Sequence, residues 1–503
     1  MASAEQGPSL RQRVATVVRA RLLTSLVDAA TGILLVRTLP KAEFAVLMLL
    51  LVVHETLKQI ATLGLPESVL YFAERWGASR HRALAWRTSA MIAGHAALSG
   101  TIMLGMAFTT DLWLASWELA PRAQVARYLP WIAAMSLCEL PTWPTTNVLI
   151  GTGKTAQAGA YEVTTSLLLL AAILTPAILG FGLPGIATGL VLYGVSRLVI
   201  SAAWLLRCLP SRGQVGLPQG SLRKQFRFAA PLGLSALSSR VNKYIDRTVV
   251  AVMLPALAFA DYTAATTEVP FLNVFPHGAA SVLIARYVFL WQGGDREALL
   301  RLWHKANKVI GLLMLPAGLL LIAMAPDLIA LAFGPNYDGA VVPFRIFSLL
   351  VAIRVANIGA LIQAFGETRA LLRITLTVLS LNLILNVPLT WLMGTAGTAT
   401  ATLLATLAGA MLTYRLVAMK LDVPFGQTAP FKSLGKIALL ASFSASMAWL
   451  ARQLIFPEEF SPAWTVALMT ILHTSIYLPL GVRLGIVRRE DFGYLRMLIR
   501  SSR

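Results

Sequence analysis

The sequence has little charge and almost no cysteine. Only 13% of its 503 residues are Asp, Glu, Lys or Arg, whereas 57% are hydrophobic and the mean hydropathy is +0.69. Soluble domains carry about 25% charged residues, so this composition excludes an ordinary soluble domain and predicts a polytopic membrane protein. The two cysteines, Cys138 and Cys208, have no metal-binding or redox spacing. We therefore expect free thiols, no metal site and no bound cofactor.

A nucleotide-binding loop is also missing. Residues 151–155 (GTGKT) end like a phosphate-binding loop, but that loop needs glycine at the position of Val148. We therefore expect no direct drive by ATP hydrolysis. In a soluble protein the net charge of +20 would indicate a nucleic-acid partner, but most of these cations lie beside hydrophobic segments. Membrane topology explains them, and we expect no nucleic-acid partner.

Long apolar segments make up most of the chain. A helix needs about 20 apolar residues to cross a bilayer, and the sequence predicts an all-α polytopic membrane protein with about 14 transmembrane helices. The connecting loops are short, and residues 65–83 form one of the longest. Prolines inside the spans (Pro141, Pro144, Pro316 and Pro388) predict kinks. The predicted spans are 15–38, 43–64, 84–109, 127–150, 158–180, 183–207, 227–253, 260–285, 307–333, 341–364, 371–393, 396–418, 434–455 and 463–485.

Lysine and arginine collect at one set of span ends. This set includes residues 207–227, residues 296–308 and the C-terminal tail after residue 483. Basic residues favour the cytoplasmic side of a membrane. We therefore expect both termini to be cytoplasmic.

Short segments of the first half recur in the second half, in the same order and at a nearly constant offset. Six spans separate the copies, so we expect two pseudo-symmetric six-helix lobes, an arrangement found in transporters that rock two bundles about a midplane site. The predicted boundaries are 1–210 and 211–425 for the lobes, and 426–503 for two additional helices with a basic cytoplasmic tail. The recurring pairs are 39–45 with 254–260, 68–70 with 281–283, 153–155 with 366–368, and 185–188 with 397–400.

The seventh predicted span carries a high density of charge. Arg240, Lys243 and Arg247 share one helical face, and Asp246 adjoins the last of them. Each charge at the bilayer centre costs about 2.5–3.5 kcal/mol on insertion scales, so these groups should face water or a partner. The functional interpretation is a cationic cavity that binds a diphosphate through charge-assisted hydrogen bonds. In the alternative interpretation they form a structural network in which Asp246 neutralises a cation on a neighbouring helix.

The second span contributes His54, Glu55 and Lys58. Glu55 and Lys58 are spaced i, i+3 and can pair on one helix. In the functional interpretation His54 or Glu55 carries a coupling proton and Lys58 helps to hold phosphate. In the alternative, a buried Glu–Lys pair fixes the packing of the helix.

Further carboxylates in the spans are candidates for binding a coupling proton or sodium ion. Their alternative role is to pair with a cation on another helix, such as Arg197 or Arg354. Arg354, in the middle of the tenth span, is also a candidate contact for a sugar phosphate. The carboxylate candidates are Asp28, Glu139, Asp246 and Glu268.

Several short motifs resemble those of the Wzx-type polysaccharide flippases, which belong to the MOP superfamily with the lipid II flippases and the MATE exporters. The Asp–Arg pair of the seventh span is the most specific of them. Asn382 and Asn386 match polar positions of the family's eleventh span, which makes them candidate substrate contacts. The other motifs are 64–71 (GLPESVLY), 230–235 (APLGLS) with 244–247 (YIDR), 260–264 (ADYTA), and 325–329 (APDLI) with 333–337 (FGPNY).

The resemblance implies a flippase that moves undecaprenyl-diphosphate-linked oligosaccharide from the cytoplasmic to the periplasmic leaflet of the bacterial inner membrane, for lipopolysaccharide or exopolysaccharide synthesis. It implies a transporter rather than an enzyme. The membrane potential alone or additional coupling to a proton or sodium ion could drive transport, and the sequence leaves both open. Cytoplasmic glycosyltransferases and a periplasmic polymerase are candidate partners. Two alternatives remain. A MATE-type drug/cation antiporter is disfavoured by a cationic cavity, and a membrane-embedded polysaccharide polymerase or ligase by the short outer loops.

Overall fold

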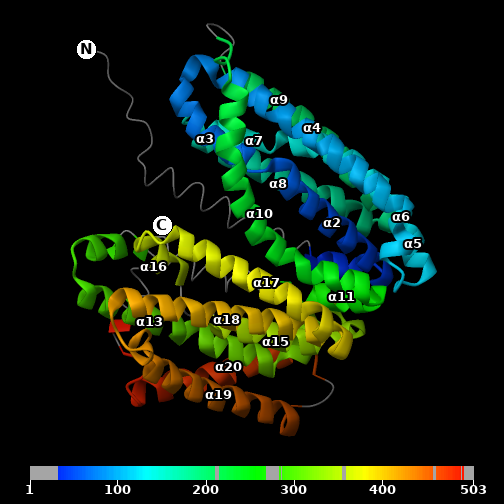
Figure 1. The fold of residues 1–503 in the computed structure, drawn as a ribbon. Coiled ribbons are helices and arrows are strands. Elements are labelled where there is room, and N and C mark those ends of the chain that lie inside the picture. The colour runs from blue at the N-terminus through cyan, green and yellow to red at the C-terminus, as the bar shows by residue number, and fades with distance from the viewer. Residues whose placement is uncertain are drawn as a thin grey trace, which may run out of the picture. The chain divides into compact units, whose positions relative to one another are not determined.

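The computed structural model describes residues 32–209, 215–267, 283–284, 286–353, 358–456, 460–488 and 490–491. Within these ranges every regular element is a helix (Figure 1). Nine helices of this described part are long and apolar enough to cross a membrane. The prediction of an all-α polytopic fold is therefore confirmed. Of the first predicted span, only residues 32–38 are described, and they are helical.

The chain divides into two compact units, Met1–Ala260 and Asp261–Arg503, which we call unit 1 and unit 2. The predicted lobe boundaries at 210 and 425 stay a prediction. Unit 1 contains α2 (Lys41–Thr62), α3 (Leu65–Trp76), α4 (His81–Phe108), α5 (Thr110–Trp113), α6 (Leu119–Glu139), α7 (Pro144–Gly151), α8 (Thr155–Ile178), α9 (Gly182–Cys208) and α10 (Ser221–Met253).

Most of the segment 65–83, expected to be a loop, is helical. Helix α2 ends at Thr62. The next residue, Leu63, has a left-handed φ of 40°, and Gly64 follows with a φ of 71°. Helix α3 then starts at Leu65 and continues the apolar stretch. A two-residue left-handed break can therefore interrupt a helix without a loop, because glycine adopts positive φ at little cost.

The fourth predicted span breaks where its prolines predict a kink. Helix α6 ends at Glu139, a short 3₁₀ turn covers Leu140–Thr142, and α7 begins at Pro144. Proline lacks the backbone N–H that would continue the α-helical ladder. Pro316 and Pro388 lie inside the continuous helices α13 and α17, so a proline alone does not decide where a helix ends.

Helix α6 is central to unit 1, where it packs against α2, α4 and α9. Its buried face is mostly apolar and includes Val125, Leu129 and Ile132, each fully buried. The same face carries Ser136 and Glu139 near its C-terminal end. Burial of apolar area holds the bundle together, and the two polar groups at its end must find partners inside it.

Helix α10, which carries the charged stripe, belongs to unit 1 and packs on α2 and α3. Its backbone lies directly against the α2–α3 break, where a Cβ placed on Gly233 would come within 2.2 Å of the Leu63 carbonyl carbon. Near its start, the Gln225 amide donates to Ser68 Oγ at 3.1 Å and to Thr88 Oγ1 at 2.8 Å. These contacts fix the position of α10 within its unit.

The far end of α10 is fixed as well. Trp117 Nε1 donates to the Ala251 carbonyl at 2.8 Å, and Ser116 Oγ donates to the Val252 carbonyl at 3.0 Å. Both donors lie in the segment that precedes α6. The long charged helix is thus held at both ends by side chains of its own unit.

Unit 2 has its own helical core. Helix α13 packs on α15 and α19, α17 on α18, and α19 on α20. The Trp303 indole donates to the Thr428 carbonyl at 2.7 Å, and Lys308 Nζ lies 2.7 Å from Asp491 Oδ2. The elements are α11 (Ala256–Ala265, which begins in unit 1), α13 (Arg296–Ala323), α14 (Ala325–Phe333), α15 (Val341–Ile353), α16 (Ile358–Ala364), α17 (Thr368–Met393), α18 (Thr395–Leu421), α19 (Phe431–Leu454) and α20 (Pro462–Arg483).

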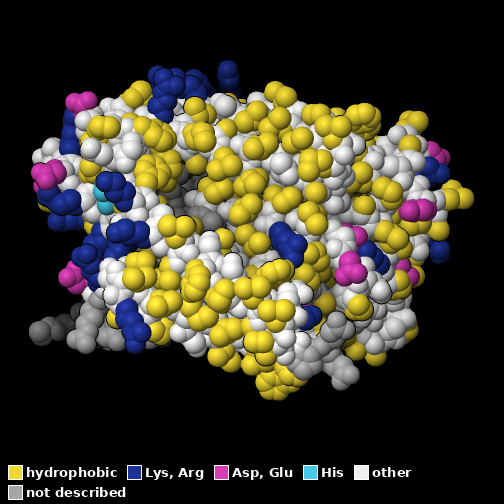
Figure 2. Space-filling model, turned by 90° about the horizontal axis from the view of Figure 1, so that it is seen from below, with side chains coloured by type: hydrophobic (Ala, Val, Ile, Leu, Met, Phe, Trp, Pro, Cys, Tyr) yellow, Lys and Arg dark blue, Asp and Glu magenta, His cyan; other side chains and the backbone are white. Residues whose placement is uncertain are grey.

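Large hydrophobic side chains are exposed on the surface. On α17, Ile384 is 67% exposed and Trp391 78% exposed. Figure 2 shows a face on which hydrophobic side chains cover the broad middle while Lys and Arg gather toward one edge. An apolar belt bordered by basic residues is the surface expected of a protein that sits in a bilayer.

Candidate functional site

The structure describes only part of the predicted site. Asp28, Glu268 and Arg354 lie outside the described residues. At Arg240 and Lys243 the backbone of α10 is described but the side chains are not. The predicted roles of these five residues stay predictions.

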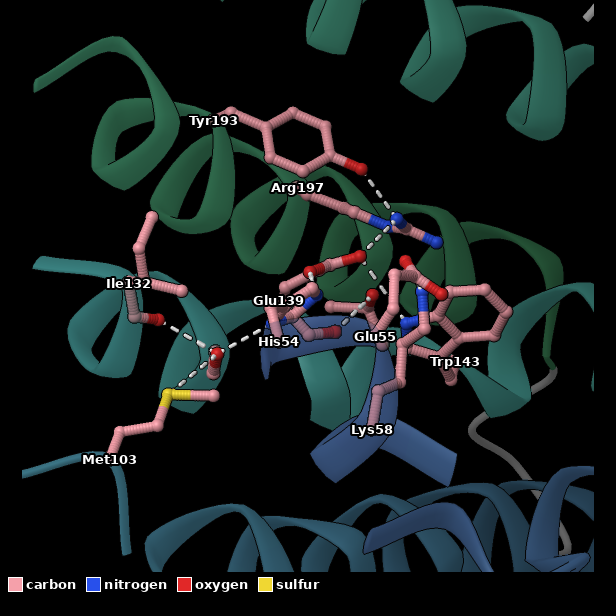
Figure 3. Close-up of polar contacts among 11 residues, drawn as sticks. His54, Glu55, Lys58, Met103, Ile132, Glu139, Trp143, Tyr193 and Arg197 are labelled. Carbon is pink, nitrogen blue, oxygen red and sulfur yellow. Dashed lines mark hydrogen bonds and ion pairs between the residues drawn. The ribbon is translucent and has the colours of Figure 1, made fainter. Parts of the chain in front are cut away.

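Four of the remaining predicted residues come together inside unit 1, within one buried cluster (Figure 3). Helix α2 contributes His54, Glu55 and Lys58, and the last residue of α6 contributes Glu139. Helix α9 adds Arg197 and Tyr193, and Trp143 projects from the junction between the 3₁₀ turn and α7. The sequence presented these residues as separate groups, and the packing of α2, α6 and α9 joins them.

Glu139 lies at the centre of the cluster. Its Oε1 accepts hydrogen bonds from Arg197 at 3.0 Å and from Trp143 Nε1 at 3.3 Å. Its Oε2 lies 2.9 Å from His54 Nε2. Glu139 is only 4% exposed, and a buried carboxylate needs such partners to offset its lost hydration. Arg197, named as an alternative partner for the intramembrane carboxylates, is therefore the partner of this one.

Lys58 is held at the edge of the same cluster. Its Nζ donates to Glu55 Oε1 and lies 4.5 Å from the centre of the Trp143 ring. The Arg197 guanidinium lies 5.3 Å from the same ring, so one indole contacts two cations in cation–π geometry. Lys58 is 5% exposed, and this geometry favours the alternative in which the Glu55–Lys58 pair fixes helix packing.

His54 links the charged groups to a hydroxyl. Its Nδ1 lies 2.7 Å from Ser136 Oγ, on the side of the ring away from Glu139. Ser136 is one turn before Glu139 on α6, so both can contact the same imidazole. His54 is 3% exposed and Ser136 is fully buried. The imidazole thus bridges a hydroxyl and a carboxylate in the interior of the unit.

The charges of this cluster nearly cancel. Glu55 and Glu139 carry two negative charges, and Lys58 and Arg197 carry two positive charges. The net charge of the cluster therefore depends on His54. It is zero when the imidazole is neutral and +1 when the imidazole is protonated.

The other described candidates lie elsewhere. On α10, Asp246 is 6% exposed and Arg247 is partly exposed. On α17, Asn386 Nδ2 donates to Asn382 Oδ1 at 3.0 Å, and both residues are at most 1% exposed. These two amides are buried inside unit 2 rather than presented to a ligand. Their predicted substrate contact stays a prediction.

Sequence reasoning did not identify Ser136 and Trp143 as members of a site. Serine and tryptophan are common in apolar spans. The only signal in the sequence is that Ser136 lies one helical turn before Glu139 and Trp143 one turn after it. Among the described residues, no group of three or more His, Cys, Asp or Glu is arranged to hold a metal ion.

Comparison with solved structures shows a fold shared with known membrane transporters. The inward closed conformation of the lipid II flippase MurJ matches with a TM-score of 0.70 and 12% identity, over 93% of this chain and 98% of that one. An inward-facing multidrug resistance MATE family transporter of the MOP superfamily matches with a TM-score of 0.64 and 17% identity, over 81% and 98%. At these identities the likeness concerns the fold.

Sequence comparison adds the family. No curated protein sequence matches the chain. A family model described as polysaccharide biosynthesis protein matches residues 10–284, which is more than half of its length. The expected family is thereby confirmed, and the chain belongs to the polysaccharide biosynthesis protein family.

Proposed function

We propose that this protein is a flippase for undecaprenyl-diphosphate-linked oligosaccharide. It moves the glycan head group from the cytoplasmic to the periplasmic leaflet of a bacterial inner membrane by alternating access of a cationic central cavity. The observation that carries the proposal is the combination of a polysaccharide biosynthesis family with the fold of a lipid II flippase. Together they support a lipid-linked sugar as the cargo.

The charged stripe of α10 supplies the chemistry for the head group. Arg240, Lys243 and Arg247 recur on one helical face, and a diphosphate is an acceptor-rich anion that guanidinium and ammonium groups bind strongly. In this proposal Arg354 is a further contact, and Asn382 and Asn386 contact sugar hydroxyls in another conformation. Lys58 pairs with Glu55, and its predicted contact with the phosphate stays a prediction.

The membrane potential assists the movement. An inside-negative potential favours outward transfer of an anion by about 2.3 kcal/mol per charge per 100 mV. Coupling to an ion adds to this drive, and Asp28, His54, Glu55, Glu139, Asp246 and Glu268 are the candidate sites for a proton or a sodium ion. Both termini are cytoplasmic in this proposal, where glycosyltransferases deliver the substrate, and a periplasmic polymerase receives it.

A reconstitution experiment tests the function. The purified protein is placed in vesicles that contain undecaprenyl-diphosphate-linked oligosaccharide, and accessibility of the glycan to an external glycosidase reports flipping. The triple variant R240A/K243A/R247A should flip at least tenfold more slowly than the parent, because the diphosphate loses its cationic partners. The matched control is R223A/K224A, which removes two exposed cations from the start of the same helix.

The outcomes are distinct. Equal flipping by the triple variant and the parent, with equal amounts of folded protein, would remove the cationic-cavity proposal. Absence of flipping by the parent would remove the flippase proposal itself. Elongation of the glycan in the same vesicles would indicate a polymerase or ligase.

A drug/cation antiporter is the second candidate, favoured by the structural match to a MATE transporter. That match covers 81% of this chain, whereas the flippase match covers 93%. A cationic cavity also repels cationic drugs. Efflux of a cationic dye from the same vesicles, driven by a proton or sodium gradient, would decide for the antiporter.

A further inference from the structure

The hydroxyl of Ser136 has one hydrogen but more than one neighbouring acceptor to which it could donate. The carbonyl oxygen of Ile132 and the Nδ1 of His54 each lie 2.7 Å from Ser136 Oγ, and Met103 Sδ lies 3.9 Å away. A hydroxyl donates one hydrogen bond and accepts up to two. Whether Ser136 donates to His54 or accepts from it therefore depends on the protonation of the ring.

Two complete arrangements fit these distances. When His54 is protonated, Nε2–H faces Glu139 Oε2 at 2.9 Å, Nδ1–H donates to Ser136, and the hydroxyl hydrogen points to the Ile132 carbonyl. When His54 is neutral, Nε2–H still faces Glu139, and the hydroxyl turns to donate to the bare Nδ1. Both arrangements satisfy the ring and the hydroxyl, so a proton can be gained or lost without leaving either unpaired in the interior.

The remaining charges around His54 are held by other contacts. Glu55 pairs with Lys58 on α2, and Glu139 of α6 pairs with Arg197 of α9, which Tyr193 also contacts. On α4 the His95 ring contacts the Ala61 carbonyl at 2.8 Å, and α10, which packs on α2, carries Asp246 and Arg247. With both carboxylates of the cluster engaged by cations, His54 is the group through which the cluster changes charge.

The same contacts distinguish a proton from a sodium ion. Hard cations require several oxygen ligands. Here the oxygens of Glu139 are engaged by Arg197 and Trp143 on one side and by His54 on the other. The atoms that face the carboxylate are N–H donors, which would repel a metal cation. This cluster is built to accept a proton on nitrogen.

We propose that His54 is a proton-binding site of this protein and that the Ser136 hydroxyl is the switch that accommodates both protonation states. The step transfers one proton from the aqueous phase to Nδ1 and reverses one hydrogen bond, and no bond between heavy atoms forms or breaks. This inference deepens the proposed function, because it names the coupling ion at this cluster and the residue that carries it. Ser136 is a positioning residue that acts through His54.

A spectroscopic titration tests the site without any transport. The full chain is labelled with ¹⁵N-histidine in nanodiscs, and the His54 signals are assigned with the variant His54→Gln. We expect a protonated ring with two N–H groups at low pH and a neutral ring protonated on Nε2 at high pH. Ser136→Ala should weaken proton binding about tenfold, because the hydrogen bond that it removes from the charged ring is stronger than the one it removes from the neutral ring. Ser136→Thr should restore proton binding.

Several results would overturn the proposal. They are a ring that keeps one protonation state from pH 5 to 9, a neutral form protonated on Nδ1, or equal titration in the parent and in Ser136→Ala. Thermal melting of each variant shows that it is folded, and His81→Gln serves as the matched histidine control.

A second experiment connects the site to flipping. In the glycan vesicles, an imposed pH gradient should change the flipping rate of the parent severalfold, whereas His54→Gln should lose this response and keep the response to membrane potential. A response to pH that survives in His54→Gln, or a sodium gradient that replaces the pH gradient, would contradict the proposal. If the parent flips no glycan but His54 titrates as expected, the proposed function fails and the proton site stands.

Discussion

Glu139 shows how a single carboxylate can organise three helices. Its carboxylate contacts Arg197 of α9, His54 of α2 and Trp143 of the segment that follows its own helix. Such a group compensates charges that would otherwise be buried alone. The contribution of Glu139 to the stability of the fold is therefore larger than the energy of any one of its contacts, because its loss would leave several buried partners unpaired.

Replacing Glu139 with Gln should strongly destabilise the protein. The change leaves Arg197 buried without a counter-charge, and removing one partner of a buried pair typically costs about 3–5 kcal/mol. In a thermal melt of detergent-purified protein this should lower Tm by about 3–5 °C, because the entropy of unfolding scales with the length of the chain. A shift below about 2 °C would show that water or another group compensates Arg197.

The double variant provides the control. Glu139→Gln combined with Arg197→Gln removes both charges, so its Tm should lie above the value expected from adding the two single effects. Contacting residues typically show a coupling of about 0.5–3 kcal/mol in such a cycle. Strict additivity would mean that the pair does not interact.

Glu367 lies outside the membrane spans, and its ion pair with Lys420 makes the stability of the protein depend on pH. Its carboxylate accepts a hydrogen bond from Lys420, and this contact lowers the pKa of Glu367 below its ordinary value of 4.5. A lowered folded-state pKa stabilises the protein above the ordinary pKa, and the stabilisation is lost as the pH falls through the lowered value.

The stability difference between the parent and Glu367→Gln should therefore be present at pH 7 and shrink below about pH 4.5. Thermal melts across this range measure it. The effect should be small because both side chains are about one-third exposed. A difference that grows toward low pH would contradict the assignment.

At the scale of elements, the contact between α10 and the α2–α3 break leaves no room for a side chain. A Cβ on Gly233 would lie 2.2 Å from the carbonyl carbon of Leu63 and 2.4 Å from its oxygen. Backbone atoms cannot give way as a flexible side chain can. This contact sets the position of the charged helix.

Gly233→Ala should therefore displace α10 and destabilise unit 1. Overpacking of this kind typically costs about 1–3 kcal/mol of stability, and occasionally more. Melting temperature and glycan flipping measure the two consequences. The matched control is Gly105→Ala in α4, where a Cβ would meet nothing within 4 Å, and this change should be neutral or slightly stabilising. Equal behaviour of the two variants would contradict the close approach.

The helix breaks illustrate what local sequence can predict. Pro141 and Pro144 indicated an interruption that is present between α6 and α7. Residues 65–83, most of which are helical, are predicted as a loop. The second predicted span ends at residue 64, next to the break at Leu63–Gly64. Its glycine was visible, but its left-handed conformation is selected by the packing of α10 against it.

At the scale of the whole molecule, the distribution of basic residues predicts the orientation. A fluorescent protein fused after Arg503 should fluoresce, and alkaline phosphatase fused there should be inactive, because the C-terminus is expected in the cytoplasm. Alkaline phosphatase inserted between Leu454 and Pro462, in the α19–α20 connection, should be active. The opposite pattern would invert the topology.

Composition and charge spacing were enough to establish a membrane protein built of helices, since hydrophobic length and i, i+3 pairing are local properties. The Glu55–Lys58 pair follows from that spacing, and Arg197 could be named as a partner for a carboxylate on another helix. The contacts of His54 with Glu139 and Ser136 could not be derived in this way. They join residues 82 positions or more apart in the chain, and only the packing of α2 against α6 decides which polar groups of two apolar helices meet.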